Sequence, residues 1–164
     1  MPDTLEQKIA RYGPRLYGLC VRLCGSRYHA DDLYQETWLR VCGSIDRYDP
    51  SMSFEPWLTA ICVNCYRDSL RRRRWERFIA AFDDDDSRDS AIHSVAADDH
   101  SQENAELWEA VRRLPEKYRT AIILHYFRGY DVKELSDILK IPAGTVKYRL
   151  HRARELLKGE LSDE

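Results

Sequence analysis

The feature that most constrains the fold is a stretch near the C-terminus, GYDVKELSDILKIPAGTVKYRLHRAR. Apolar residues repeat at three- and four-residue spacing from Val132 to Leu139, so a short helix there buries one stripe. Asp131, followed by Glu134 three residues later, predicts a capping box at its start. Pro142 ends this pattern and suits the first position of a second helix. We therefore predict a helix-turn-helix.

The second of these helices has a polarised surface. Its apolar stripe, at about 100° per residue, consists of Val146, Leu150, Ala153 and Leu157. Mostly cationic or polar side chains occupy the two flanks, Thr145, Tyr148, Arg149 and Arg152 on one and Lys147, His151, Arg154 and Lys158 on the other. A recognition helix needs this arrangement, because its apolar edge docks on the preceding helix while its flanks reach bases and phosphates. The alternative is a solvated face of an ordinary amphipathic helix.

Charge divides the chain into three segments, although the net charge is only −2. Residues 1–77 carry 13 Lys and Arg against 10 Asp and Glu, and residues 103–164 carry 12 against 11. Residues 78–102 carry 1 against 7 and almost no apolar periodicity, which predicts a flexible acidic linker. We expect two small domains joined by this linker. No strand pattern occurs, so the predicted fold is all-α.

Composition indicates in which compartment the protein acts and which kinds of chemical site it lacks. No apolar run approaches a membrane span, and five cysteines fit a reducing compartment, so we expect a cytoplasmic protein. Cys62 and Cys65 lie inside a helical pattern without a second ligand pair, and we interpret all five cysteines as packing residues. The run Asp83–Asp86 lacks the glycine and alternating ligands of a calcium loop. We predict no metal site, no cofactor and no catalytic residues.

The N-terminal part predicts two helices. A seam runs from Leu5 to Leu23 and ends near Gly25. A second helix begins near His29 and buries one side, Ala30, Leu33, Thr37, Trp38 and Val41. Its opposite side exposes Asp32, Gln35, Glu36 and Arg40. Periodicity alone gives this polar patch no function.

A loop and a basic helix follow. The loop between Gly43 and Ser53 carries Tyr48 and leads into Phe54 and Trp57. A third helix, from about Pro56 to Arg77, places on one face Asn64, Arg67, Arg71 and Arg74. Aromatic side chains beside a basic helix suit a nucleic-acid strand, whose bases stack and whose phosphates meet cations. The sequence alone equally allows core aromatics beside a solvated Arg run.

The C-terminal part predicts two more helices before the helix-turn-helix. The first runs from Glu103 to Leu114, and Pro115 stops it. The second, Glu116 to Phe127, supplies apolar surface through Ala121, Ile122, Leu124 and Tyr126. Together with the helix-turn-helix, they predict a compact four-helix domain.

Four motifs, in this order and spacing, resemble those of one family. The helix DDLYQETWLR (residues 31–40) is similar to that family's DAEDLVQETFLRV. The stretch that begins FEPWL at Phe54 and continues to Arg73 resembles its F-x-x-WL…I…N…D-x-x-RRR element. LPEKYR and then GTVK with RLHRAR resemble its region 4. The whole chain thus resembles a bacterial group IV, or extracytoplasmic-function, sigma factor of the sigma-70 family.

The resemblance implies that different parts of the chain bind different partners. Residues 1–77 correspond to region 2, 78–102 to the linker and 103–164 to region 4. The core polymerase surface corresponds to Asp31, Asp32, Leu33, Gln35, Glu36 and Arg40. The minus-10 surface, which captures a flipped base, corresponds to Tyr48, Phe54, Trp57, Asn64, Arg67, Asp68, Arg71 and Arg72. The minus-35 surface corresponds to Thr145, Lys147, Tyr148, Arg149, His151, Arg152 and Arg154.

The implied partners are core RNA polymerase through its β′ and β subunits, promoter DNA and an anti-sigma factor, with no small-molecule substrate. Two positions depart from the family pattern. Tyr148 replaces the usual Ser, which affects the minus-35 preference. Val63 replaces a frequent Arg, which removes one phosphate contact. Glu36→Lys is the substitution that the sequence suggests for testing polymerase docking without harm to the fold.

Three other functions remain open at this point. A simple helix-turn-helix regulator would bind duplex DNA without polymerase, but it has no need of the N-terminal motifs. A sigma-like protein without initiation activity would occupy polymerase or bind another protein. A metal-dependent enzyme would use the Asp run or Cys62 and Cys65, and ligand spacing disfavours it.

Overall fold

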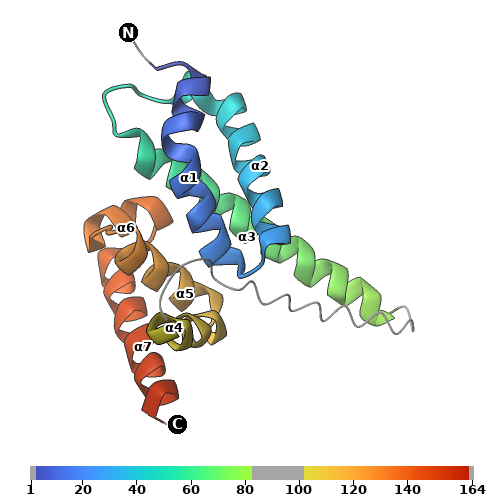
Figure 1. The fold of residues 1–164 in the computed structure, drawn as a ribbon, viewed down its shortest axis with the longest axis vertical. Coiled ribbons are helices and arrows are strands. Elements are labelled where there is room, and N and C mark those ends of the chain that lie inside the picture. The colour runs from blue at the N-terminus through green and yellow to red at the C-terminus, as the bar shows by residue number, and fades with distance from the viewer. Residues whose placement is uncertain (1–2, 83–101, 163–164) are drawn as a thin grey trace. The chain divides into compact units, whose positions relative to one another are not determined.

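The computed structural model describes residues 3–82 and 102–162 and divides the chain into two compact units, residues 1–94 and 95–164 (Figure 1). Every element of the described residues is helical, so the all-α prediction is confirmed. None of these helices combines the length and the apolar composition that crossing a bilayer requires.

The first unit is a three-helix bundle. It consists of α1 (Leu5–Cys24), α2 (Arg27–Ser44), the 3₁₀ turn η1 (Ile45–Arg47) and α3 (Phe54–Phe82). α1 and α2 lie along each other and both contact α3. Its core contains Leu16, Leu19, Leu23, Ala30, Leu33, Thr37, Val41, Leu58, Cys62, Val63 and Tyr66. The last turns of α3 extend beyond the other two helices (Figure 1) and are exposed.

Local sequence signals explain the ends of α1 and α2. Thr4 and Gln7 form a capping box at the start of α1. Gly25 ends that helix with φ of 68°, a left-handed conformation that glycine adopts without steric cost. Ser26 then caps α2, because its side chain accepts a hydrogen bond from the His29 N–H at 3.5 Å.

The second unit packs four helices around its own core. It consists of α4 (Gln102–Arg113), α5 (Glu116–Ile122), the π-helical turn η2 (Ile123–Phe127), α6 (Val132–Leu139) and α7 (Ala143–Ser162). α4, α5 and α6 all contact α7. Buried residues include Val111, Leu114, Ala121, Ile123, Leu124, Leu135, Ile138, Leu139, Val146, Leu150 and Ala153.

The predicted helix-turn-helix consists of α6 and α7. Asp131 and Glu134 form the predicted capping box. Lys140 turns the chain with φ of 55°, and the Ser136 hydroxyl donates a hydrogen bond to the Ile141 carbonyl at 2.6 Å. Pro142 precedes α7 instead of occupying its first position. Its carbonyl accepts the first helical hydrogen bonds of α7, so it fixes the entry into that helix.

Both boundaries of α3 differ from the prediction. The third helix was expected over Pro56 to Arg77, but α3 begins at Phe54 and continues to Phe82. Residues 78–82 were assigned to the linker, but they are helical. Ala80 and Ala81 favour helix, and the Asp run begins only after them. The acidic residues 83–101 lie outside the described residues.

The cysteines differ in burial, and Cys24 is half-buried. Cys20, Cys62 and Cys65 are buried, as the packing interpretation predicts, and the Cys20 and Cys62 sulfur atoms lie 3.8 Å apart. Their contact raises the pKa of Cys20, and burial raises the pKa of Cys65 to about 11. The packing interpretation is wrong for Cys42, which is exposed because it lies on the outer side of α2.

Candidate functional site

The outer face of α2 combines carboxylates, an amide and apolar side chains. Asp32 and Gln35 are exposed, as the sequence predicts, and Asp31 is exposed beside them, whereas Glu36 and Arg40 are half-buried. Asp31 is held in place because the Tyr17 hydroxyl donates a hydrogen bond to it at 2.7 Å. That hydrogen bond raises the pKa of Tyr17. Leu33 does not belong to this face. It is buried in the bundle, because its position in the helical period points it toward the core.

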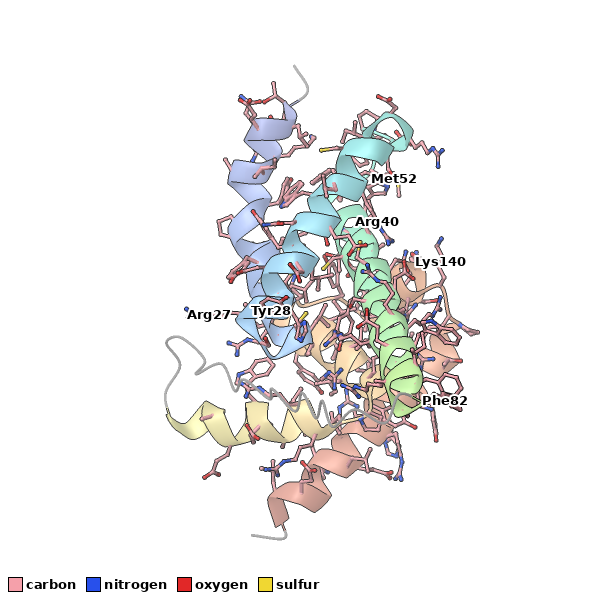
Figure 2. The ribbon with its side chains drawn as sticks, turned by 90° about the vertical axis from the view of Figure 1, so that its right-hand side faces the viewer. Arg27, Tyr28, Arg40, Met52, Phe82 and Lys140 are labelled. Carbon is pink, nitrogen blue, oxygen red and sulfur yellow. The ribbon has the colours of Figure 1, made fainter. Side chains whose placement is uncertain are left out.

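Two apolar residues of the same face were not predicted. Tyr28 and Leu39 are 70% and 71% exposed. Tyr28, Asp32, Gln35 and Leu39 follow at spacings of four, three and four residues, so they share one stripe of α2. Figure 2 places Tyr28 at the start of that helix. The spacing of Tyr28 and Leu39 from Asp32 and Gln35 was the signal in the sequence that could have identified these two residues.

Glu36 and Arg40 belong to an ion-pair network that joins α2 to α3. Arg40 lies 3.1 Å from Glu36 and 2.9 Å from Asp68, and Arg72 lies 3.0 Å from Glu36. Arg71 approaches Asp68 at 3.8 Å. Arg40 appears between the two helices in Figure 2, and its hydrogen bond with Asp68 raises its pKa. Residues that were predicted to bind polymerase therefore form ion pairs with residues that were predicted to bind minus-10 DNA.

This network changes the choice of test substitution. Glu36→Lys was expected to leave the fold intact, but a lysine there would face both Arg40 and Arg72. It would remove two ion pairs and add like-charge repulsion between α2 and α3. Asp32 is exposed and lies outside the network, so it is the better position for a charge reversal.

The loop after η1 leads into an aromatic cluster. Tyr48 lies 5.3 Å from Phe54 and 5.0 Å from Trp57, measured between ring centroids. The Tyr48 hydroxyl donates a hydrogen bond to the Met52 carbonyl. Asp49 accepts hydrogen bonds from the Ser51 N–H and hydroxyl at 2.9 and 2.8 Å, and these bonds lower the pKa of Asp49. The loop is thus folded into a tight turn beside the cluster.

Phe54 forms the base of this cluster and not its open surface. It is only 5% exposed, whereas Tyr48 and Trp57 are half-buried. Phe54 therefore offers little exposed surface of its own, because neighbouring rings pack against it. Tyr12, at 5.0 Å from Phe54, and Lys8, whose Nζ lies 4.9 Å from the Phe54 centroid, complete the cluster. Both come from α1 and were not predicted, since their contact with the loop is long-range.

The α3 residues that were predicted to contact minus-10 DNA lie on two neighbouring faces of the helix. Asn64, Arg71 and Arg72 are exposed, and Arg67 and Asp68 are half-buried. Asn64 and Arg71 share one face, whereas Arg72 turns toward Glu36 of α2. Val63 is fully buried and packs in the core of the first unit. The expected effect of this departure on a phosphate contact stays a prediction.

The predicted recognition helix, α7, exposes its cations along two flanks. Lys147, Tyr148, His151, Arg152 and Arg154 are exposed, and Thr145 and Arg149 are half-buried. Glu155 lies 3.0 Å from His151 and 3.1 Å from Arg152. The hydrogen bond from Arg152 is the largest of the effects that lower the pKa of Glu155. Glu155 therefore contacts two of the residues that are predicted to meet DNA.

Tyr126 contacts this helix from the π-helical turn. The Arg154 Nε donates a hydrogen bond to the Tyr126 hydroxyl at 2.7 Å, and its guanidinium carbon lies 5.6 Å from the ring centroid. Tyr126 was expected to supply apolar surface together with Ala121, Ile122 and Leu124, but unlike them it is exposed. The π-helical turn inserts an extra residue into the helical period and so rotates Tyr126 outward.

Comparisons with known proteins agree with these two units. The Sigma-70 region 2 model matches residues 9–76, and the Sigma-70, region 4 model matches residues 104–157. The ECF RNA polymerase sigma factor SigW of Bacillus subtilis is 32% identical, over 98% of this chain and 90% of the relative. The RNA polymerase sigma factor CarQ of Myxococcus xanthus is 34% identical, over 99% and 93%.

A solved structure has a similar fold. The sigma factor RpoE from Bartonella quintana, in complex with the anti-sigma factor NepR, matches with a TM-score of 0.76 and 25% identity over 96% of each chain. The fold and the matched regions define the class of sigma-70 initiation factors. The chain belongs to the extracytoplasmic-function (ECF) RNA polymerase sigma factors within that class. It is a sigma factor, which directs core RNA polymerase to promoters and promotes strand opening.

Proposed function

We propose that each surface carries one step of initiation. The stripe of α2 that contains Tyr28, Asp32, Gln35 and Leu39 docks on core polymerase, with the carboxylate and amide as polar contacts and the two apolar side chains as anchors. This proposal rests on their shared exposure. A docking surface of this kind combines apolar burial with charges that steer association.

The minus-10 proposal assigns different roles to the aromatic cluster and to α3. Tyr48 and Trp57 hold an unstacked base over the buried Phe54, and Lys8 adds a positive charge at the cluster. Asn64, Arg67 and Arg71 contact the adjoining strand. Asp68 and Arg72 position α2 against α3 through the ion-pair network. Capture of an unpaired base needs a stacking surface together with cations, and this unit has both.

The minus-35 proposal concerns α7. The first turns of this helix, from Thr145 to Arg149, enter the major groove, and Lys147, His151 and Arg152 meet phosphates or base edges. Tyr126 holds Arg154 in one orientation. Residues 1–77 and 103–164 thus serve as the two DNA-binding domains on either side of residues 78–102.

An anti-sigma factor is the proposed regulatory partner, since the RpoE structure contains one. The chain is proposed to act in the cytoplasm, where polymerase works, and to contribute binding and positioning instead of catalysis. The observation that carries the function is the placement of an exposed acidic and apolar stripe on α2 in the same unit as the aromatic cluster and the basic face of α3.

Run-off transcription with purified core polymerase and a library of promoter fragments tests this function. The chain should yield specific transcripts that depend on its presence. Asp32→Lys should reduce core affinity about tenfold or more, because it reverses a charge in the docking surface. Asp46→Lys makes the same charge change at an exposed residue outside the stripe and should leave core affinity unchanged.

The alternative functions give different results in this experiment. Core binding without transcripts would indicate a factor that only occupies polymerase. DNA binding without core binding would indicate a simple regulator. Equal core affinity of Asp32→Lys and the unsubstituted chain would contradict the docking proposal.

A further inference from the structure

The last turns of α3 carry an exposed aromatic ladder, Trp75, Phe78 and Phe82, which none of the surfaces above uses. These side chains are 61%, 54% and 75% exposed. Trp75 stacks on Phe78 with ring centroids 5.7 Å apart and an interplanar angle of 24°, and Phe78 meets Phe82 edge-on at 4.8 Å. Figure 2 places Phe82 at the end of the helix. A contiguous exposed apolar patch of this kind marks an interaction site.

The aromatic ladder continues the face of α3 that is proposed to contact DNA. Asn64, Arg71, Trp75, Phe78 and Phe82 follow one another at spacings of seven, four, three and four residues. Residues at such spacings share one side of a helix. α3 is one continuous helix from Phe54 to Phe82, so this face runs without interruption from the nucleic-acid surface to the helix end.

At the Trp75 end of the ladder, charge favours a nucleic acid over a protein as the ligand. Arg67, Arg71 and Arg74 lie along one edge of this face, and the Arg71 side chain is 76% exposed. A protein partner that buried the ladder would have to desolvate the neighbouring guanidinium groups. A DNA strand would instead supply phosphates to these groups while its bases stack on the rings.

We propose that the aromatic ladder binds an unpaired DNA strand and so extends the α3 surface beyond the minus-10 residues. The inference deepens the proposed promoter function and rests on it. The ligand is single-stranded because an exposed ring stacks on a base only when that base has left the duplex stack. The arginine edge follows the phosphates, and the rings meet the bases.

The test uses the full chain bound to core RNA polymerase. Its affinity for fluorescein-labelled oligodeoxythymidine is measured by anisotropy, with core polymerase alone as background. Trp75→Ala and Phe78→Ala should each weaken the chain-dependent affinity about fivefold or more, because each removes a stacking surface. Ile79→Ala is the matched control. Ile79 is an exposed apolar neighbour without a π face, so its removal should leave the affinity unchanged.

Salt dependence separates stacking from charge. The two aromatic variants should keep the slope of log affinity against log salt, whereas Arg74→Ala should reduce its magnitude by about 0.7, the value for one single-strand phosphate contact. Helix content, measured by circular dichroism, should not change, because all four positions are exposed at the end of α3.

Other outcomes would overturn the inference. If both aromatic variants bind like the unsubstituted chain while Arg71→Ala weakens binding, the ladder proposal is wrong and the promoter function stands. If Ile79→Ala weakens DNA binding as much as the two aromatic variants do, and all three variants also bind polymerase less tightly, the patch is a protein interface. The ladder proposal is then again wrong. If the complex binds no better than core polymerase alone, the minus-10 function itself fails.

Discussion

His29 lies half-buried near the start of α2, where burial and then the charge of Arg73 lower its pKa from the ordinary value of 6.5. The folded protein therefore binds this proton less readily than the unfolded chain. The resulting contribution to stability is complete above pH 6.5 and is lost as the pH falls from 6.5 through the lower folded value. An NMR titration of the His29 ring should give a midpoint below 6.5.

Arg73→Gln serves as the control for this titration. It removes the second cause of the shift, so the midpoint should move upward while remaining lowered by burial. A midpoint at or above 6.5 in the unsubstituted protein would contradict the burial of the ring.

Single residues also show where sequence reasoning succeeds and fails. Asp32 and Gln35 were predicted as exposed, because a helical period separates one side of α2 from the other. Leu33 and Phe54 were assigned to surfaces through family motifs, but both are buried. A motif preserves residue type and spacing without stating which residues touch a partner and which support those that do. Lys8 joins the cluster only through tertiary packing.

Among the elements, α6 depends on its N-terminal cap. Asp131 accepts a hydrogen bond from the Glu134 N–H at 2.8 Å, and Glu134 accepts one from the Asp131 N–H at 3.2 Å. Asp131→Ala should lower the free energy of unfolding of the second unit by about 1 kcal/mol in urea denaturation. Asp137→Ala, an exposed carboxylate of the same helix, should change it by less than about 0.5 kcal/mol. If both substitutions lowered the free energy of unfolding equally, the N-terminal cap would contribute no specific stabilisation.

The same element-level comparison explains which helices could be predicted. The helix-turn-helix was predictable because the capping box, the apolar period and Pro142 agree with one another. The π-helical turn was not, because one extra residue in the period leaves no compositional signal, and Tyr126 was consequently grouped with the apolar residues of that helix. The end of α3 was missed because its exposed aromatic residues resemble neither a core stripe nor a polar face.

In the whole molecule, each unit has its own core. Leu19→Ala in the first unit and Leu150→Ala in the second should each cost about 2–5 kcal/mol, because both side chains are almost fully buried. Hydrogen exchange measured by mass spectrometry should show lost protection only in the unit that carries the substitution, and the two effects should add in the double variant. Lost protection in both units from either substitution would mean that they unfold together.

Charge segmentation along the chain was sufficient to predict two units, because a strongly acidic segment with little apolar content cannot build a core. Periodicity then identified most of what each unit buries. The contacts that join the candidate surfaces, Glu36 with Arg72 and Arg154 with Tyr126, were not predictable, because their partners lie 36 and 28 residues apart in the sequence.

The ion-pair network between α2 and α3 has a consequence for genetic screens. Glu36 is shared between Arg40 and Arg72, so loss of Arg72 leaves Glu36 paired with Arg40 alone on the helix that is proposed to dock on polymerase. If the proposed roles of α2 and α3 hold, a screen for polymerase-binding defects should therefore recover Arg72 variants, although Arg72 lies on α3, the helix proposed to contact DNA. Second-site suppressors of such variants should map to α2. Phenotype alone would thus assign residues of this network to the wrong partner.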